Sequence, residues 1–482
     1  MRVSNRRGNE AETAIRSWTM GLRLAVSVLL LAAATIGSSP SLAQLPDISK
    51  MPANPPPQPQ LTMFPHPPSR YWISGQANFV YQTNPPFDAE YSGPHSFDSA
   101  YDKASGRVMT LYTGYQLTKS IEVLCDLEES EGAGISDALG LAGYVNLDAT
   151  KDPTLSQAPY LSRIVYHQVF SFSNDTVDGN RGPLSTFSRL PTRRLELRVG
   201  KFAITDYFDT NTYGSDSHLQ FLNWAIDQNG AYDFTADARG YTWGVHLEYQ
   251  SAAFGARFAE VLLPGPENGG PLVWDLRKAR SSNAEFELHR GPLHKKDGVI
   301  RVLGYANNGN MGIYKDAIQQ YLDGKTRQPE IDNHPLQVTT KYGFGLNFEQ
   351  PVNANVGFYG RFGWNNGKTE SWSFTEIDQT FSSGVVTTGN VWKRTADRAG
   401  VAFASNGISH VHAEYLALGG LGFVLGDGRL RYARENLIEG FYTAHVWRGL
   451  YVAPDLQYIV NPGYNQDRGP VLVPAFRVHV EF

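Results

Sequence analysis

The sequence has 482 residues, a length that fits two or three soluble domains or one large barrel. Its formal net charge is −5, so broad binding to nucleic acid through a basic surface is excluded. Cys125 is the single cysteine, which excludes an intramolecular disulfide; it is expected to be a small apolar filler.

The first 43 residues have the pattern of a secretory signal peptide. Arginines precede an apolar block at residues 24–36 (LAVSVLLLAAATI), and residues 41–43 (SLA) offer a small-residue cleavage site. The block is shorter than the about 20 residues that a membrane-spanning helix needs. We therefore expect cleavage after Ala43 rather than a retained anchor, with Met1 or Met20 as the start. Cleavage would remove five of 42 basic and two of 47 acidic residues, leaving a net charge of −8.

Residues 44–70 are predicted to be a lead-in without a core. PANPPPQPQLTMFPHPPS, residues 52–69, is rich in proline and has no period. Such a composition favours an extended or disordered segment. The folded domain should then span residues 71–482.

From Tyr71 onward the sequence alternates between apolar and polar residues, which predicts strands. YTWGVHLEY (241–249) and FGARF (254–258) form a predicted hairpin with a short turn. KYGFGLNF (341–348) and VGFYGRFGWN (356–365) repeat the pattern, and a long polar stretch to about residue 390 follows. Short and long connections in alternation are typical of an outer-membrane barrel, with tight periplasmic turns and longer outer loops.

The predicted fold is all-β, a transmembrane antiparallel β-barrel of the bacterial outer membrane with about 16 strands. The count of predicted strands is about fourteen to sixteen, and it depends on whether residues 411–428 are counted as strand. A soluble β-sandwich or β-solenoid would also alternate. The apolar faces, however, end in Tyr, Trp and Phe, and the opposite faces carry charges, glycines and amides, as lipid and a water-filled lumen would require. After the signal peptide, no apolar run is long enough for a transmembrane helix, so a barrel is the expected way to enter a membrane.

The alternation assigns a set of polar side chains to the lumen. These predicted pore-lining residues are Glu196, Arg198, His246, Glu248, Arg257, Glu285, Arg301, Arg361, Asp455, Gln457, Arg477 and His479. Both signs of charge occur in similar numbers, whereas a phosphate pore would need an excess of cations and a cation pore an excess of acids. Mixed charge suits neutral polyols, whose hydroxyl groups donate and accept hydrogen bonds. For any one of these residues, mutual neutralisation that merely solvates the wall is the competing interpretation.

Motifs for catalysis, cofactors or metals are weak. The glycines of GGLGFVLGDG (419–428) do not match a dinucleotide or phosphate loop and are expected to make tight turns. His410, His412 and Glu414 form one short cluster on a predicted strand or loop, so we expect no metal site. No G-x-S-x-G motif is present, yet triads are spatial, so a barrel enzyme stays open as an alternative. The prediction is no enzyme and no cofactor.

The final segment, PAFRVHVEF (474–482), alternates with great regularity. Phe476 and Phe482 share the apolar face, while Arg477 and His479 share the polar one. We expect this strand to pair with the one that begins near Tyr71 and so remove both open edges. The terminal Phe482 resembles an assembly signal, which would make the barrel-assembly machinery a partner.

Four long stretches resemble the carbohydrate-selective porin family typified by OprB. They are HLQFLNWAIDQNGAYDFTADARGYTWG (218–244), WSFTEIDQTFSSG (372–384), HAEYLALGGLGFVLGDGRLRYARENLIEGFYTAHVW (412–447) and APDLQYIVNPGYNQDRGPV (453–471). The resemblance implies a sixteen-stranded outer-membrane barrel that admits glucose and related sugars by passive diffusion through a constriction with charged and aromatic side chains. The proline-rich lead-in has no clear counterpart in this family.

The expected function is an outer-membrane porin for carbohydrates with a water-filled, mixed-charge lumen. The alternatives are a general diffusion porin, an export channel for an acidic polysaccharide and, less favoured, a barrel enzyme. The expected partners are neutral sugars in transit, outer-membrane lipids and the assembly machinery, with the barrel as a homotrimer or a monomer and no nucleic acid.

Overall fold

The computed structural model describes residues 60–149, 155–293 and 298–482. The predicted signal peptide and residues 44–59 of the lead-in lie outside these described residues. Within them, sixteen antiparallel strands close into one barrel, in which β1 pairs with β18. The prediction of an all-β barrel with about 16 strands is confirmed.

The barrel strands are β1 (Tyr71–Asn84), β2 (Asp102–Gln116), β3 (Ile121–Gly132), β4 (Tyr160–Ser171), β7 (Arg194–Phe202), β8 (Thr242–Gln250), β9 (Phe254–Val261), β10 (Arg280–Leu288), β11 (Val299–Gly309), β12 (Thr339–Pro351), β13 (Val356–Asn365), β14 (Gln379–Thr388), β15 (Arg398–Gly407), β16 (Glu435–Trp447), β17 (Leu450–Val460) and β18 (Val471–Glu481). A separate two-stranded sheet contains β5 (Thr176–Asp178) and β6 (Arg189–Pro191). The α-helices are α2 (Trp224–Asp227), α3 (Tyr314–Leu322) and α4 (His410–Ala417), and the 3-10 helices are η2 (Ile135–Ala138), η3 (Ile204–Asp206), η4 (Gly389–Trp392) and η5 (Pro462–Tyr464). No helix in the described part of the chain is long and apolar enough to cross a membrane.

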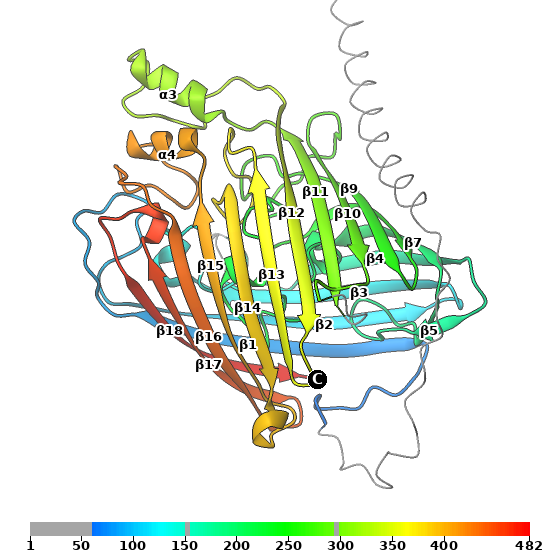
Figure 1. The fold of residues 1–482 in the computed structure, drawn as a ribbon. Helices are drawn as coiled ribbons and strands as arrows, with labels where there is room; N and C mark the ends of the chain where they lie inside the picture. The colour runs from blue at the N-terminus through cyan, green and yellow to red at the C-terminus, as the bar shows by residue number, and fades with distance from the viewer. Residues whose placement is uncertain (1–59, 150–154, 294–297) are drawn as a thin grey trace, which may run out of the picture. The chain divides into compact units, whose positions relative to one another are not determined.

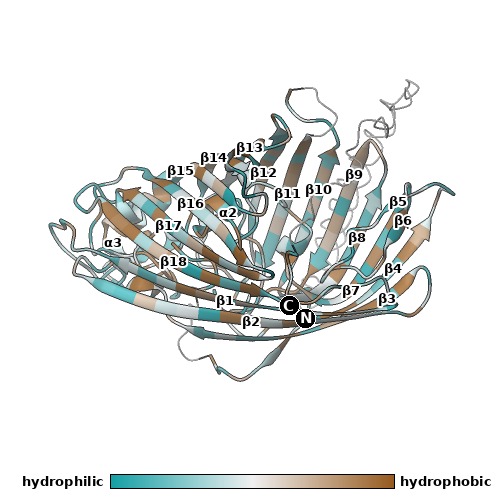
Figure 2. Cartoon of the chain, turned by 90° about the horizontal axis from the view of Figure 1, so that it is seen from below, coloured by the Kyte–Doolittle hydropathy of each residue, from teal (hydrophilic) through white to brown (hydrophobic). Residues whose placement is uncertain are grey.

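The strands form because their side chains alternate between two environments. On β18, Phe476 is 47% exposed on the outer wall, whereas its neighbour Arg477 is 1% exposed inside. Figure 2 shows the resulting bands of hydrophobic and hydrophilic residues along the strands. Large apolar side chains that stay exposed on an outer wall are expected where that wall faces lipid.

The two ends of the barrel sheet meet at β1 and β18, as expected from the final segment. The register pairs Phe79 with Val478 and Gln82 with Ala475. The backbone N–H of Phe482 extends the ladder by donating to the Gly75 carbonyl at 2.8 Å. Every barrel strand therefore has two neighbours, which leaves no open edge in the hydrocarbon region.

The barrel has two unlike ends. At the turn end, short connections such as residues 251–253 and 352–355 join neighbouring strands; at the loop end, the connections include residues 203–241, 310–338 and 408–434. Figure 1 shows α3 and α4 at the loop end and the C-terminus at the other. This contrast is the predicted alternation of short and long connections.

Two local predictions are wrong, and one stretch that the sequence left open is now assigned. The polar stretch after residue 365 is not one long loop, because β14 begins at Gln379; its inward residues are small and polar, which hid the strand. The stretch 411–428 adds no barrel strand, since His410–Ala417 is a helix. One turn-end connection is long, because residues 172–193 between β4 and β7 carry β5 and β6.

The lipid-facing wall gives a stability test. Phe476→Arg places a charge at the middle of β18, and such substitutions at the bilayer midplane cost about 2–4 kcal/mol. We expect the variant to lose this much free energy of unfolding in phospholipid vesicles, measured by urea titration. Val446→Arg, next to the β16–β17 turn, is the matched control and should cost about 0–1 kcal/mol. Equal losses in both variants would contradict the assignment of the wall to lipid.

Candidate functional site

All twelve predicted pore-lining residues point to the inside of the barrel. Eleven of them are buried, and the side chain of the twelfth, Arg257, is also mostly covered, with 8% exposed. The alternation therefore assigned each of them to the correct face. Their part in lining the pore stays a prediction, because other parts of the chain cover most of their surface.

Six of these residues, together with Glu287 on β10, form one continuous row of ion pairs across β7 to β11, in which Arg257 and Arg301 both bond Glu287. Arg198 bonds Glu196 on its own strand and Glu248 on β8, the latter at 2.9 Å. Arg257 on β9 then bonds Glu248 at 2.8 Å and Glu285 on β10 at 2.6 Å. Arg301 on β11 continues the row through Glu287 at 2.8 Å. Acids and bases alternate, so their charges largely cancel along this wall.

The imidazole of His246 is wedged into this row. Its Nδ1 lies 3.2 Å from Nη1 of Arg198, and its ring stacks on Tyr207 with the centroids 4.6 Å apart. Tyr207 follows η3, so the row also contacts the loop that enters the barrel between β7 and β8. His246 thus has a packing role that the sequence pattern did not indicate.

Residues 203–241, which we call the inward loop, fold into the barrel. Arg361 on β13 holds this loop: its Nε lies 3.0 Å from Oδ2 of Asp209, and its Nη1 donates to the Ile226 carbonyl at 2.8 Å. The Asn347 amide on β12 donates to Oδ1 of Asp209 at 2.9 Å. The backbone N–H of Asp209 donates to Glu285 at 2.9 Å, which ties the loop to the ion-pair row.

The same loop is fastened to strands beyond β15. Glu439 on β16 accepts from the backbone N–H groups of Leu222 and Asn223, and Arg477 on β18 donates to the carbonyls of Ser217 and Gln220 at 2.6 and 2.9 Å. Gln457 on β17 accepts from the Asn223 amide at 2.9 Å. The inward loop therefore crosses the interior between two parts of the wall.

Aromatic rings fill the space around α2. The Trp224 ring stacks against Phe374, from the connection 366–378, with the centroids 4.9 Å apart. Phe234 stacks against Phe374 at 5.0 Å. The backbone N–H of Trp224 also donates to the Tyr144 carbonyl of the β3–β4 connection. Three connections thus pack together inside the barrel and narrow it.

Polar groups on the inward loop remain open to solvent. Asp216 lies 3.5 Å from Arg398, and these two side chains are 29% and 40% exposed. His218 stacks on His479 with the centroids 5.3 Å apart. Burial lowers the pKa of His218, but the Asp148 carboxylate at 3.4 Å outweighs burial and raises this pKa to about 9. At neutral pH the exposed interior therefore carries charges of both signs.

The long connection 172–193 reaches back into the turn end. Glu122 on β3 accepts from the Thr186 backbone N–H at 2.7 Å and from the Ser185 hydroxyl at 2.9 Å. The same carboxylate lies 2.7 Å from Nδ1 of His167 on β4. Arg181 stacks over Trp72 of β1, with its guanidinium carbon 4.8 Å from the ring centroid. Part of the turn end is thereby covered, which tight turns alone would not do.

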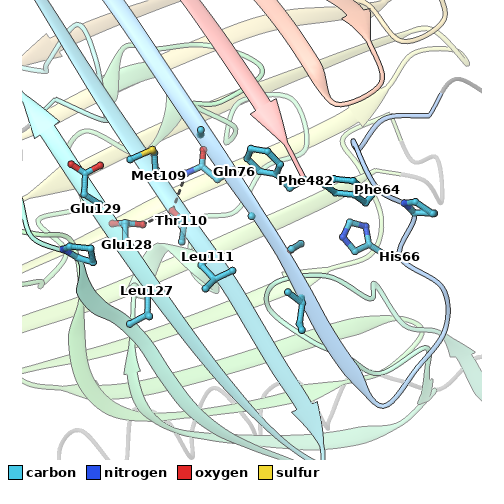
Figure 3. Close-up of a pocket in the computed structure, with 16 residues that line it drawn as sticks. Phe64, His66, Gln76, Met109, Thr110, Leu111, Leu127, Glu128, Glu129 and Phe482 are labelled. Atoms are coloured by element: carbon cyan, nitrogen blue, oxygen red, sulfur yellow. Dashed lines mark hydrogen bonds between the residues drawn. The ribbon is translucent and has the colours of Figure 1, made fainter.

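A pocket of about 660 Å³ lies against β1 to β3. Figure 3 shows its aromatic border of Phe64 and Phe482 and the side chains of Met109, Leu111 and Leu127. The last three belong to the exposed outer wall. The buried polar residues Gln76, Thr110 and Glu128 also line it, so the pocket follows the exposed wall at β1 to β3 and reaches between its strands.

Three carboxylates meet at the loop end. The carboxylate oxygens of Glu267, Asp332 and Glu370 lie within 4.8 Å of one another. Burial raises the pKa of Glu370 to about 8, so this group carries a proton at neutral pH. Protonation removes one of three like charges, and we assign no ligand to the cluster.

His412, one member of the short histidine cluster, is buried and joins two other loop segments through contacts that we call the His412 latch. Its Nδ1 lies 3.1 Å from Asp378, and its Nε2 lies 3.1 Å from the Tyr314 hydroxyl and 3.7 Å from Glu376. Burial lowers the pKa of His412, but Asp378 and Glu376 outweigh it, so the pKa is raised. His410 and Glu414 point to solvent from the same helix and do not join it.

Sequence reasoning missed the residues that hold the loops, because their partners are distant in the sequence. Glu439, Asp209 and Asp216 carried no motif. One signal was available: several inward positions of β12 and β13 are glycines, which the sequence pattern assigned only to a water-filled lumen. Inward glycines indicate a close approach of other chain segments.

Comparison with known proteins places the chain among porins. A family model described as carbohydrate-selective porin, OprB family, matches residues 98–482. The high-pH structure of OprB from Pseudomonas putida is similar, with a TM-score of 0.64 and 16% identity over 86% of this chain and 94% of that chain. An anion-selective porin from Comamonas acidovorans has a TM-score of 0.46 and 10% identity over 86% of this chain and 99% of that one. The search of curated proteins returned no match.

The His412 latch predicts a pH-dependent loop end. The pKa of His412 is raised in the folded state, so its contribution to the stability of the folded loop end is complete below the unfolded pKa of 6.5. This contribution is lost as the pH rises through the folded pKa. Burial raises the pKa of Asp378, but His412 outweighs burial and lowers this pKa. Asp378 therefore contributes to the stability of the folded loop end above its unfolded pKa of 3.8, and this contribution is lost as the pH falls through the folded pKa. Limited proteolysis near α3 and α4 should therefore be slowest between about pH 4 and 6.5 and faster at pH 9.

Two variants separate His412 from its neighbours. His412→Gln should raise proteolysis at pH 6 and flatten the pH profile, with the remaining slope due to Glu370. The exposed neighbour His410→Gln should keep the parent profile. The latch is contradicted if both variants behave alike.

Proposed function

Because the chain belongs to the OprB family of carbohydrate-selective porins, we propose that it lets neutral sugars, glucose and its relatives, diffuse passively through its barrel. The observation that carries the proposal is the family match over residues 98–482. The family and the fold support a porin of the outer membrane, that is, a channel rather than an enzyme. The choice of sugars is the proposed part.

The inward loop supplies the constriction in this proposal. It spans the barrel between Arg361 and Arg477, so a solute must pass the side chains that it leaves exposed, such as Asp216 and His218. Because charges of both signs are present there, the constriction prefers neither anions nor cations. The hydroxyl groups of a sugar can donate hydrogen bonds to the negative groups and accept them from the positive ones. Binding must be weak, because a site that holds a solute tightly releases it slowly.

The ion-pair row supports neutral solutes over polyanions. An export channel for an acidic polysaccharide needs an excess of exposed cations, whereas Arg198, Arg257 and Arg301 are each paired with carboxylates. A general diffusion porin stays the second candidate, since a neutral wall would also pass small solutes without preference. The predicted roles of the other interior residues, and of Phe482 in assembly, belong to this proposal.

Outer-membrane lipids are the proposed surroundings of the apolar wall, and the barrel-assembly machinery is the proposed partner before folding. The assembled barrel acts as a monomer or as a homotrimer, and each barrel encloses its own path. The proposal needs neither cofactor nor nucleic acid.

Sugar block of ion current tests the proposed substrate class. The purified protein in planar bilayers should conduct salt, and glucose or a glucose oligomer should lower that current while it occupies the pore. Liposomes with the protein should swell faster in neutral sugars than in uronates. A salt-conducting channel that ignores every sugar would be a general porin, and faster swelling in uronates would favour the export channel.

Ion selectivity tests whether Asp216 lies on the solute path. Asp216→Asn removes an exposed negative charge next to Arg398, so the ratio of anion to cation permeability should rise. Asp178→Asn is the control, because Asp178 is 90% exposed on β5, outside the barrel sheet. Reversal potentials in a salt gradient measure both. If Asp216→Asn kept the parental ratio of anion to cation permeability, Asp216 would not lie on the solute path.

A further inference from the structure

Two glycines face each other on the inside of the barrel. Gly345 on β12 and Gly363 on β13 are directly paired in the strand register. A Cβ atom added at Gly363 would lie 1.9 Å from Oδ1 of Asn229, and one added at Gly345 would lie 2.5 Å from Nδ2 of the same side chain. Real Cβ atoms do not approach other heavy atoms this closely. The two glycines therefore leave a niche that the Asn229 carboxamide occupies.

Asn229 is itself held rigidly within the inward loop. Its Oδ1 accepts from the Ala231 N–H at 3.1 Å, and its Nδ2 donates to the Phe362 carbonyl of β13 at 3.4 Å. Its backbone N–H donates to Oδ2 of Asp209 at 2.8 Å. That oxygen also pairs with Arg361, so the niche and the ion pair act on one part of the loop.

A second contact of the same kind lies further along β13. A Cβ atom at Gly357 would lie 2.0 Å from the Tyr213 ring, which also belongs to the inward loop. Glycine weakens a strand interior, so several inward glycines on adjoining strands need a reason. Close approach of Asn229 and Tyr213 supplies it.

We propose that Gly345 and Gly363 seat Asn229 and so set the distance between the inward loop and the β12–β13 wall. The three are positioning residues for the narrowest part of the pore, a role that rests on the proposed function in which this loop forms the constriction. Interiors are close-packed, so the width of the path depends on how deeply this side chain sits in the wall.

Gly363→Val tests the niche. The added side chain prevents Asn229 from seating and pulls Asp209 from Arg361, so the loop loses its fixed position. We expect the single-channel conductance in salt to rise on the order of twofold, because pore width controls permeation. Gly304→Val on neighbouring β11 is the control for adding a valine to the wall without a collision: Gly304 pairs with Phe344 on the outward face, nothing lies within 4 Å of its added Cβ, and the parental conductance should persist.

Rescue separates positioning from general damage. Asn229→Ala shortens the side chain that collides, so Gly363→Val with Asn229→Ala should return toward the parental conductance. A parental value in Gly363→Val, or a shift that Asn229→Ala does not reverse, would overturn the inference. Salt current needs no sugar, so loss of sugar block with this pattern intact would refute the proposed function alone.

Crosslinking covers the case in which Gly363→Val fails to fold. In a Cys125→Ser background, Asn229→Cys with Gly345→Cys should form a disulfide on oxidation, visible as altered mobility of the unfolded chain. Asn229→Cys with Gly304→Cys should not, because the Cβ added at Gly304 lies on the outward face of β11 and has no neighbour within 4 Å. Equal crosslinking of the two pairs, or none in the first, would overturn the niche.

Discussion

The capture of loop backbone by charged side chains of the barrel wall is the interaction on which the interior depends. Glu439 receives the N–H groups of Leu222 and Asn223, and Arg477 binds the carbonyls of Ser217 and Gln220. A loop that leaves water for the inside of a barrel cannot pair its backbone with a sheet ladder. An unpaired buried N–H or C=O costs about 1–3 kcal/mol, so the wall must supply the partners.

This constraint explains why inward charges can be numerous and yet barely exposed. Arg257 bridges Glu248 and Glu285, whereas Arg361 combines an ion pair with Asp209 and a bond to the Ile226 carbonyl. Such groups brace strands and loops, and removing one partner would leave a buried charge uncompensated. An interior ion pair that stays exposed joins Asp216 of the inward loop to Arg398 at the start of β15.

Local alternation predicted most strands but not the one with small inward residues. On β8 and β9 large outward side chains oppose charged inward ones, and the hairpin was recognised from its pattern alone. On β14 the inward residues are Thr380, Ser382 and Gly384, which pack against neighbours that the local sequence does not show. Likewise, His412 looked like part of a polar strand, although a helix buries it against Asp378.

The sequence by itself determined the barrel and the face of every one of the twelve inward residues, because a period of two is a local property and fixes which side chains share a face. The family was indicated separately, by the resemblance of four long stretches of the chain. Only the tertiary structure decided which loop enters the barrel and which charges stay exposed. Those outcomes depend on partners far apart in the chain: Asp209 meets Arg361, and Asn229 meets Gly345 and Gly363. No pattern within one strand contains such distances, so the path of a solute follows from packing.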